Sequence, residues 1–151
     1  MNKAGTIAYV ANLGAVANEV ALCNVSGKTF TCSNSNGAFA SPIGLAFSED
    51  ESQVYVTNTL NNPPFVYPSI SLCSVASDHT LNCLDSGYSG SSSLWGILVD
   101  GVNAYISNSA DNTLTLCSIS VDPLTKGQFT SCSDSGAGAI FNTPTFMTLS
   151  N

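Results

Sequence analysis

A short strand-like stretch that ends in asparagine occurs three times in this chain and sets the period of everything else. The copies are Ile7–Asn12, Gln53–Asn58 and Asn103–Asn108, and their tyrosines stand 46 and 50 residues apart. Self-similarity at such a period is a signature of proteins built from repeated structural units. We therefore expect a series of similar units instead of one irregular fold.

Six cysteines recur in phase with these copies, as one pair in each unit. Each pair flanks a turn, and residues that face each other across an antiparallel hairpin lie about 4.5–5.5 Å apart at Cα, which a disulfide can span. Zinc would need closer pairs and further ligands, and His79 is the only histidine. Free thiols are the other alternative. The expected bonds are Cys23–Cys32, Cys73–Cys83 and Cys117–Cys132.

Disulfides indicate an oxidising compartment, so the protein is expected to be secreted, on the cell surface or periplasmic. The formal charge is −7, there is no arginine, and the basic residues are Lys3, Lys28 and Lys126. Nucleic-acid binding through phosphate neutralisation is therefore not expected. No apolar run reaches the roughly 18 to 20 residues that span a bilayer, so membrane insertion is not expected either.

Four strands fill each unit and are called a, b, c and d. Strand b carries the asparagine, strands c and d carry the cysteines, and strand a is the apolar segment at 42–47, 94–99 and 144–149. Because it is almost wholly apolar at 42–47, strand a is expected to be buried on both faces. The chain reads b-c-d, a-b-c-d, a-b-c-d, a, which makes twelve strands in one repeat domain, 1–151. The units are approximately 6–40, 41–92 and 93–140, with a closing strand at 142–150.

Four antiparallel strands in about 45 to 50 residues have the size of a β-propeller blade. The sequence therefore predicts an all-β fold, a β-propeller with three blade equivalents per chain. Strand a would lie nearest the central channel and strand d at the outer edge. Tyr55–Asn58, preceded by Pro42-Ile43-Gly44-Leu45-Ala46 and the turn at Ser48-Glu49-Asp50, resembles the YVTN-type β-propeller repeat family. The paired cysteines are not part of that family's usual pattern.

This resemblance implies a propeller fold and an exported bacterial protein, and it says less about function. A closed ring has four to about eight blades, so three are too few. Two chains would give six blades, each supplying strand a to the other's first blade in a twofold-symmetric homodimer. A longer natural chain and a larger open assembly are the alternatives.

Polar residues recur at two further positions of the unit. Asn34, Asp85 and Asp134 stand two residues after the second cysteine of each pair. Their oxygens could ligate calcium, but side-chain caps of turns are the favoured interpretation, so no metal or cofactor is expected. We expect the strand-ending Asn12, Asn58 and Asn108 to bond turns, and Glu49–Glu51 to be a solvated hairpin tip.

Residues that could serve a ligand or a reaction are few. Trp95 and the tyrosines could stack on sugars, although core packing is the favoured role for Trp95. His79 falls in a turn at the outer rim, where a catalytic base is not expected, and no Ser-His-Asp set can be built without it. The chain is thus not expected to be an enzyme. It is predicted to be an extracytoplasmic structural or protein-interaction module completed by oligomerisation; a lectin-like glycan-binding propeller is the alternative, and a lactonase-like enzyme is third.

Overall fold

The computed structural model describes residues 1–13, 18–59, 69–88, 93–135 and 140–148, and over these ranges the protein is all-β, without an α-helix. The described residues form eleven strands. Their bounds are β1 Ile7–Leu13, β2 Asn18–Ser26, β3 Thr29–Asn34, β4 Pro42–Phe47, β5 Gln53–Asn58, β6 Ser69–Val75, β7 Leu81–Asp85, β8 Leu94–Asp100, β9 Asn103–Asn108, β10 Thr113–Ile119 and β11 Phe129–Asp134.

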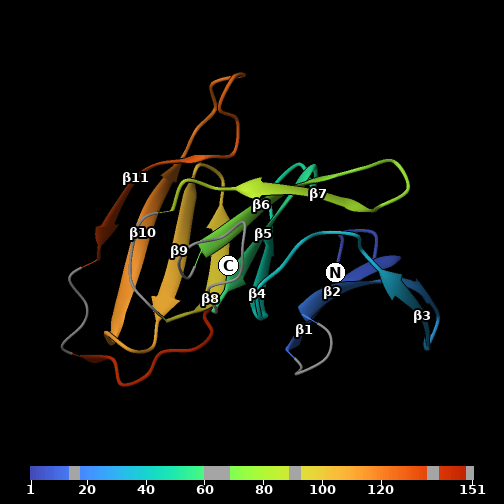
Figure 1. Ribbon diagram of the computed structural model, residues 1–151, viewed down its shortest axis with the longest axis horizontal. Coiled ribbons are helices and arrows are strands. Elements are labelled where there is room, and N and C mark those ends of the chain that lie inside the picture. The colour runs from blue at the N-terminus through green and yellow to red at the C-terminus, as the bar shows by residue number, and fades with distance from the viewer. Residues whose placement is uncertain (14–17, 60–68, 89–92, 136–139, 149–151) are drawn as a thin grey trace.

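The strands form three antiparallel sheets, and within each sheet the strands lie in chain order. The first sheet is β1-β2-β3, the second β4-β5-β6-β7, and the third β8-β9-β10-β11. Figure 1 shows the sheets side by side, with the third at the left, the second in the middle and the first at the right. Each sheet corresponds to one sequence unit, and the second and third contain strands a to d in the predicted order.

The three sheets share one register, which follows from the shared pattern of apolar residues. Tyr9 lies opposite Leu22, Tyr55 opposite Leu72, and Tyr105 opposite Leu116. A slip of one residue would turn every apolar side chain to the other face of its sheet, so the pattern specifies this pairing strongly.

One disulfide in each sheet joins strand c to strand d. The described residues include no free cysteine. The bonds are Cys23–Cys32, Cys73–Cys83 and Cys117–Cys132, with Cα–Cα distances of 4.0, 3.9 and 4.1 Å. In each case the two cysteines lie directly opposite each other in the ladder. These are the pairs predicted from the sequence, and they are compatible with an extracytoplasmic protein.

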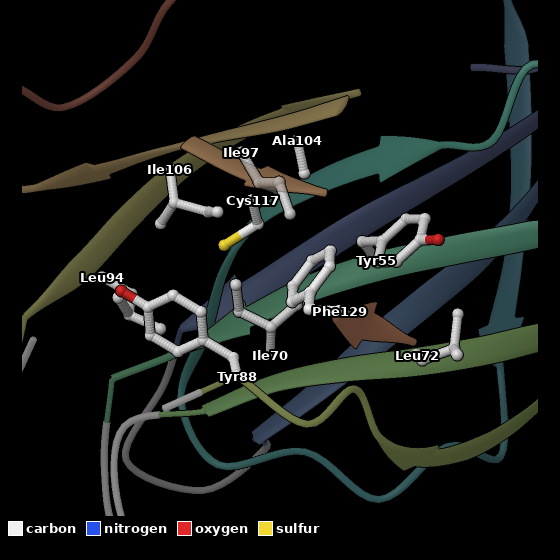
Figure 2. Close-up of a cluster of buried hydrophobic side chains, with 10 residues drawn as sticks. All are labelled: Tyr55, Ile70, Leu72, Tyr88, Leu94, Ile97, Ala104, Ile106, Cys117 and Phe129. Carbon is white, nitrogen blue, oxygen red and sulfur yellow. The ribbon is translucent and has the colours of Figure 1, made fainter. Parts of the chain in front are cut away.

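Two hydrophobic cores lie between neighbouring sheets. The core between the second and third sheets contains the stacked rings of Tyr55 and Phe129, 5.5 Å apart, with Tyr88 edge-on to Phe129 at 6.3 Å (Figure 2). The core between the first and second sheets is built from equivalent positions, namely Ile7, Tyr9, Val20, Leu22, Phe39, Val54, Val56, Cys73 and Leu81. The sheets are therefore held together face to face by one interface that occurs twice.

The expectation that strand a is buried on both faces is wrong. Along β4 only Pro42 and Gly44 are fully buried, and the side chains between and after them are half-buried. The reason is a cavity of about 310 Å³ that borders the innermost strands. Its lining comes from β1, β4, β5 and β8 and from Phe146 and Met147.

The expected twelfth strand at 144–149 is also not formed over its described part, residues 144–148. A strand needs a neighbour whose backbone groups it can pair with, and no described strand pairs with this segment. It is nevertheless anchored, because the Ser107 hydroxyl donates to the Thr145 carbonyl at 2.6 Å. Residue 149 lies outside the described residues.

Candidate functional site

Each sheet has a forward face, toward the next unit along the chain, and a rear face, toward the preceding unit. Successive side chains of a strand point to opposite faces, so the forward face carries the tyrosine of strand b while the rear face carries the disulfide. In the first sheet, for example, Tyr9 and Leu22 point forward, and Ala8 and Cys23 point to the rear. This division defines what is buried inside the chain and what is left open at its two ends.

A tyrosine hydroxyl fastens each forward face to the following sheet. Tyr9 donates to the carbonyl of His79 at 2.6 Å, and Tyr55 donates to the carbonyl of Gly127 at 2.9 Å. Both acceptors lie in the hairpin turn between strands c and d of the next unit. Burial, with a smaller contribution from the Asp50 charge, raises the pKa of Tyr55 to about 12. The hydroxyl therefore stays protonated and donates at every physiological pH.

Backbone groups make a second repeated contact next to the tyrosine. The Leu81 amide donates to the Ser35 carbonyl at 2.7 Å, and the Phe129 amide donates to the Ser86 carbonyl at 2.8 Å. Both serines follow the last strand of one unit, and both amides begin the last strand of the next.

A hydroxyl on strand b makes the third repeated contact, near the inner edge. Thr57 accepts from the Gly44 amide at 2.8 Å and donates to the Trp95 carbonyl of the next unit at 2.7 Å. Ser107 likewise accepts from the Gly96 amide at 2.8 Å and donates to Thr145. Thr145 thus occupies the place that Trp95 takes one unit earlier. Residues 144–148 lie where strand a of a following unit would lie.

We expect Tyr55→Phe to lower the free energy of unfolding by about 1–3 kcal/mol, because the buried Gly127 carbonyl loses its donor. Urea unfolding of the dilute protein measures the change. The control is Tyr105→Phe, since the Tyr105 hydroxyl forms no hydrogen bond with another described residue, and the expected change is below about 0.5 kcal/mol. Equal losses in the two variants would contradict this role for the tyrosine.

The same hydroxyl predicts an alkaline dependence of stability. Its folded pKa of about 12 lies above the ordinary tyrosine pKa of 10.0, so its contribution is complete below pH 10 and is lost as the pH rises toward 12. Tyr55→Phe should therefore lose less stability than the wild type over this range.

The rear face of the first sheet exposes two apolar side chains whose equivalents are buried. Val10 is 48% exposed, and its equivalents Val56 and Ile106 are each 0% exposed. Phe30 is 55% exposed, whereas Leu81 and Phe129 at the same position are 4% and 8% exposed. This face lacks only the sheet that would precede it.

The forward face of the third sheet is open in the complementary way. Leu114 and Leu116 are half-buried, although their equivalents Ile70 and Leu72 are 0% and 3% exposed. Tyr105 is half-buried too. Each end of the described structure therefore shows one half of an interface that is complete twice inside it.

The strand-ending asparagines are buried in two of the three units, where they bond the neighbouring strand, and among the described residues Asn58 alone of the two also bonds the backbone of the connection that leads into strand a. Asn58 is fully buried, donates to the Ser71 hydroxyl at 2.9 Å and accepts from the Ala40 amide at 3.1 Å. Asn108 is fully buried and donates to the hydroxyls of Thr115 and Thr113 at 2.8 and 3.1 Å. Asn12 is exposed. Its position lies at the free edge of β1, which has no strand a beside it.

The candidate calcium ligands act as turn caps where their bonds are described. Asn34 accepts from the Asn36 amide at 2.7 Å, and Asp85 accepts from the Gly87 amide at 2.8 Å. Both are the side-chain-to-backbone bonds of an Asx turn. Asp134 ends β11 at the equivalent position and is exposed. Within the described ranges, no three His, Cys, Asp or Glu residues are grouped closely enough to hold a metal ion.

The interpretation of Glu49–Glu51 as a merely solvated tip is incomplete, because this turn ties three parts of the chain together. Lys3 donates through its ammonium to the Glu49 carbonyl at 2.6 Å and through its amide to the Glu51 carboxylate. Lys126 pairs with Asp50 at 3.1 Å. Hydrogen bonds from Ser48 and Ser52, together with Lys126, lower the pKa of the Asp50 carboxyl.

Lys3, Ser48, Glu49, Asp50 and Lys126 rim a cavity of about 500 Å³ between the second and third sheets. Its inner wall includes the side chains of Tyr55, Val99 and Ile119. A cavity of about 190 Å³ lies at the equivalent place between the first and second sheets and is lined in part by Tyr9 and Val75. A cavity thus occurs at the same place in both sheet interfaces.

His79 and Trp95 lie apart from one another in the chain and are not joined in a site. The His79 imidazole is exposed in the β6–β7 turn, and the residue contributes its backbone carbonyl to Tyr9. Trp95 is half-buried on β8 and does not belong to either core, so the expected core packing is only partial.

Comparison with known proteins returned no matching family model, no matching curated protein and no matching solved structure. The described residues contain no helix long and apolar enough to cross a membrane. The site must therefore be interpreted from its own geometry, in which the repeated interface and its two open halves are the dominant features.

Proposed function

We propose that this chain is a section of an extracytoplasmic β-propeller and serves as a structural, protein-interaction module. The observation that carries this proposal is the interface that recurs between the sheets. The rear face of the first sheet and the forward face of the third sheet each present one uncovered half of it. The rear face around Val10 and Phe30 and the forward face around Leu114 and Leu116 are the binding surfaces. No catalytic role is proposed.

The arrangement of the sheets supports the propeller part of the proposal. Sheets of four antiparallel strands, connected in order from the inside outward and packed face to face, are the construction of propeller blades. The innermost strands β1, β4 and β8 border one cavity, as strands around a central channel would. The disulfide in each sheet then fastens the strand at the outer edge, which has one hydrogen-bonded neighbour.

The chemistry of the open faces favours a protein as partner over a glycan. Exposed Val10 and Phe30 offer apolar surface, and complementary apolar surface is what covers Val56 and Leu81 inside the chain. A sugar site is usually built from an aromatic ring beside convergent polar groups, whereas Trp95 is half-buried and stands alone in its unit position.

Site-specific photocrosslinking in the producing cells tests the proposal. A photoreactive phenylalanine analogue at position 30 or 116 should give covalent adducts with a polypeptide. The matched control is position 124, because Leu124 is 94% exposed and lies outside both faces. Adducts no more abundant at positions 30 and 116 than at 124 would contradict the proposal.

A glycan array tests the alternative propeller lectin directly. The structural module is expected to show no saturable binding to any sugar. Dose-dependent binding that free sugar competes away would replace the proposed function with glycan recognition.

A further inference from the structure

We propose that the partner of this module is a second copy of the same chain, joined head to tail so that the forward face of each third sheet covers the rear face of the other copy's first sheet. This inference rests on the proposed function and specifies its partner. Two such contacts would join two chains into a ring of six blade equivalents, a number within the range of closed propellers.

The apolar part of the contact is dictated by the two interfaces inside the chain. Tyr55, Ile70 and Leu72 of the second sheet pack with Ile106, Cys117 and Phe129 of the third (Figure 2). Tyr105, Leu114 and Leu116 occupy the first set of positions on the open forward face. Val10, Cys23 and Phe30 occupy the second set on the open rear face. Both interfaces inside the chain join a forward face to a rear face, so the two open faces are expected to pair in the same way.

The polar part of the contact follows the same rule. Tyr9 and Tyr55 donate to the carbonyl two residues before Leu81 and Phe129, respectively. The equivalent pair between copies is the Tyr105 hydroxyl with the Lys28 carbonyl, two residues before Phe30. The Phe30 amide would likewise donate to the Ser135 carbonyl, as Leu81 donates to Ser35 within the chain.

The inner edge supplies the strand that the first sheet lacks. Residues 144–148 already lie in the position of strand a of a following unit, held by Ser107. In β4 and β5, Pro42 pairs with Asn58 and Leu45 with Val56. The same register between copies sets Pro144 opposite Asn12 and Met147 opposite Val10. Asn12 then has a strand a beside it, as Asn58 and Asn108 do.

Phe146 works against this pairing, and Ala11 relieves part of the conflict. Phe146 stands at the position of Gly44 and Gly96, where an added Cβ would meet a carbonyl of the next unit at 2.4 Å. At Gly44 it would also meet the Thr57 hydroxyl at 2.8 Å. Ala11 replaces that hydroxyl on β1, so it removes one of the two obstacles to Phe146. The Ile43 carbonyl is the other obstacle. The completed first sheet must therefore lie further from the second sheet at Phe146 than neighbouring sheets lie from each other within one chain.

Light scattering of the purified, oxidised chain tests the inference together with charge variants of each face. The wild type should have a mass of about 31 kDa, twice the 15.5 kDa of one chain. Val10→Glu on the rear face and Leu116→Glu on the forward face should each weaken association at least about 100-fold, because burying an unpaired carboxylate is strongly unfavourable. Leu124→Glu is the matched control and should leave the dimer intact. Circular dichroism checks that each variant keeps its sheets.

Mixing the two variants distinguishes head-to-tail pairing from a contact between two like faces. Val10→Glu retains an intact forward face and Leu116→Glu an intact rear face, so the mixture should recover a species of two chains through one good contact. A monomeric wild type overturns the inference. A dimer that withstands both variants, or a mixture that stays monomeric, overturns it too. Crosslinking to another protein at positions 30 and 116 together with a monomeric wild type would overturn only this inference and leave the proposed function standing.

Discussion

Replacing Gly44 by alanine is expected to lower the free energy of unfolding by about 3 kcal/mol or more, as overpacking against backbone does. An added Cβ would lie 2.4 Å from the Trp95 carbonyl oxygen and 2.8 Å from the Thr57 hydroxyl. The carbonyl belongs to β8 of the neighbouring sheet and cannot rotate away as a side chain can. Relief requires the second and third sheets to separate at the inner edge, which also breaks the bond from Thr57 to Trp95.

The measurement for Gly44→Ala is urea unfolding, with Gly27→Ala as the matched control. Gly27 lies in the β2–β3 turn at φ 61, and no atom lies within 4 Å of an added Cβ. Its substitution should cost about 1 kcal/mol, from the strained backbone alone. If Gly27→Ala cost more than Gly44→Ala, close approach of the sheets would not be the reason for a glycine on strand a.

The disulfide pairing could be predicted from the sequence because it is a local property. Cys23 and Cys32 flank one short turn, so an antiparallel hairpin alone brings them opposite each other. The division into units was likewise readable from recurrence, since the tyrosine and the asparagine mark the same strand in each sheet. The disulfide pairing and the division into units both depend on contacts between residues that are close together in the sequence.

The contacts between sheets could not be predicted in the same way. Tyr9 and Tyr55 bond backbone carbonyls about seventy residues further along the chain, at His79 and Gly127. Any residue type supplies such a carbonyl, so the acceptor leaves no mark in the sequence. The recurrence of the tyrosine was the one sign of these contacts in the sequence. It marks strand b equally well, so it did not reveal the hydrogen bond to the next sheet.

The wrong or incomplete expectations have one cause, which is that distant parts of the chain set the environment of a strand or turn and its own residues do not reveal them. Strand a is apolar, yet a cavity borders β4, so Ile43 and Phe47 are half-buried. Residues 144–148 have the composition of strand a, yet they form no ladder with any described strand. Glu49–Glu51 has the composition of a solvated tip, yet Lys3 and Lys126 from distant parts of the chain bind it.

Replacing Asn58 by leucine is expected to lower the free energy of unfolding by about 2–4 kcal/mol, although leucine has nearly the same size. Asn58 is 0% exposed, and its amide serves both the Ser71 hydroxyl and the Ala40 backbone amide. Leucine leaves both groups buried without their partner, and each unsatisfied group costs about 1–3 kcal/mol. The Ala40 bond also fixes the connection that leads into β4, so the loss should include disorder at the inner edge of the second sheet.

The repeat provides the control for Asn58→Leu, because Asn12 is the same residue at the same place on strand b but is exposed. Asn12→Leu should change the stability of the single chain by less than about 0.5 kcal/mol. Urea unfolding of both variants at two protein concentrations measures the difference and separates folding from association. A loss at Asn12 as large as the loss at Asn58 would mean that the asparagine acts through strand propensity. A loss confined to Asn58 would tie the effect of this asparagine to its buried hydrogen bonds with Ser71 and Ala40.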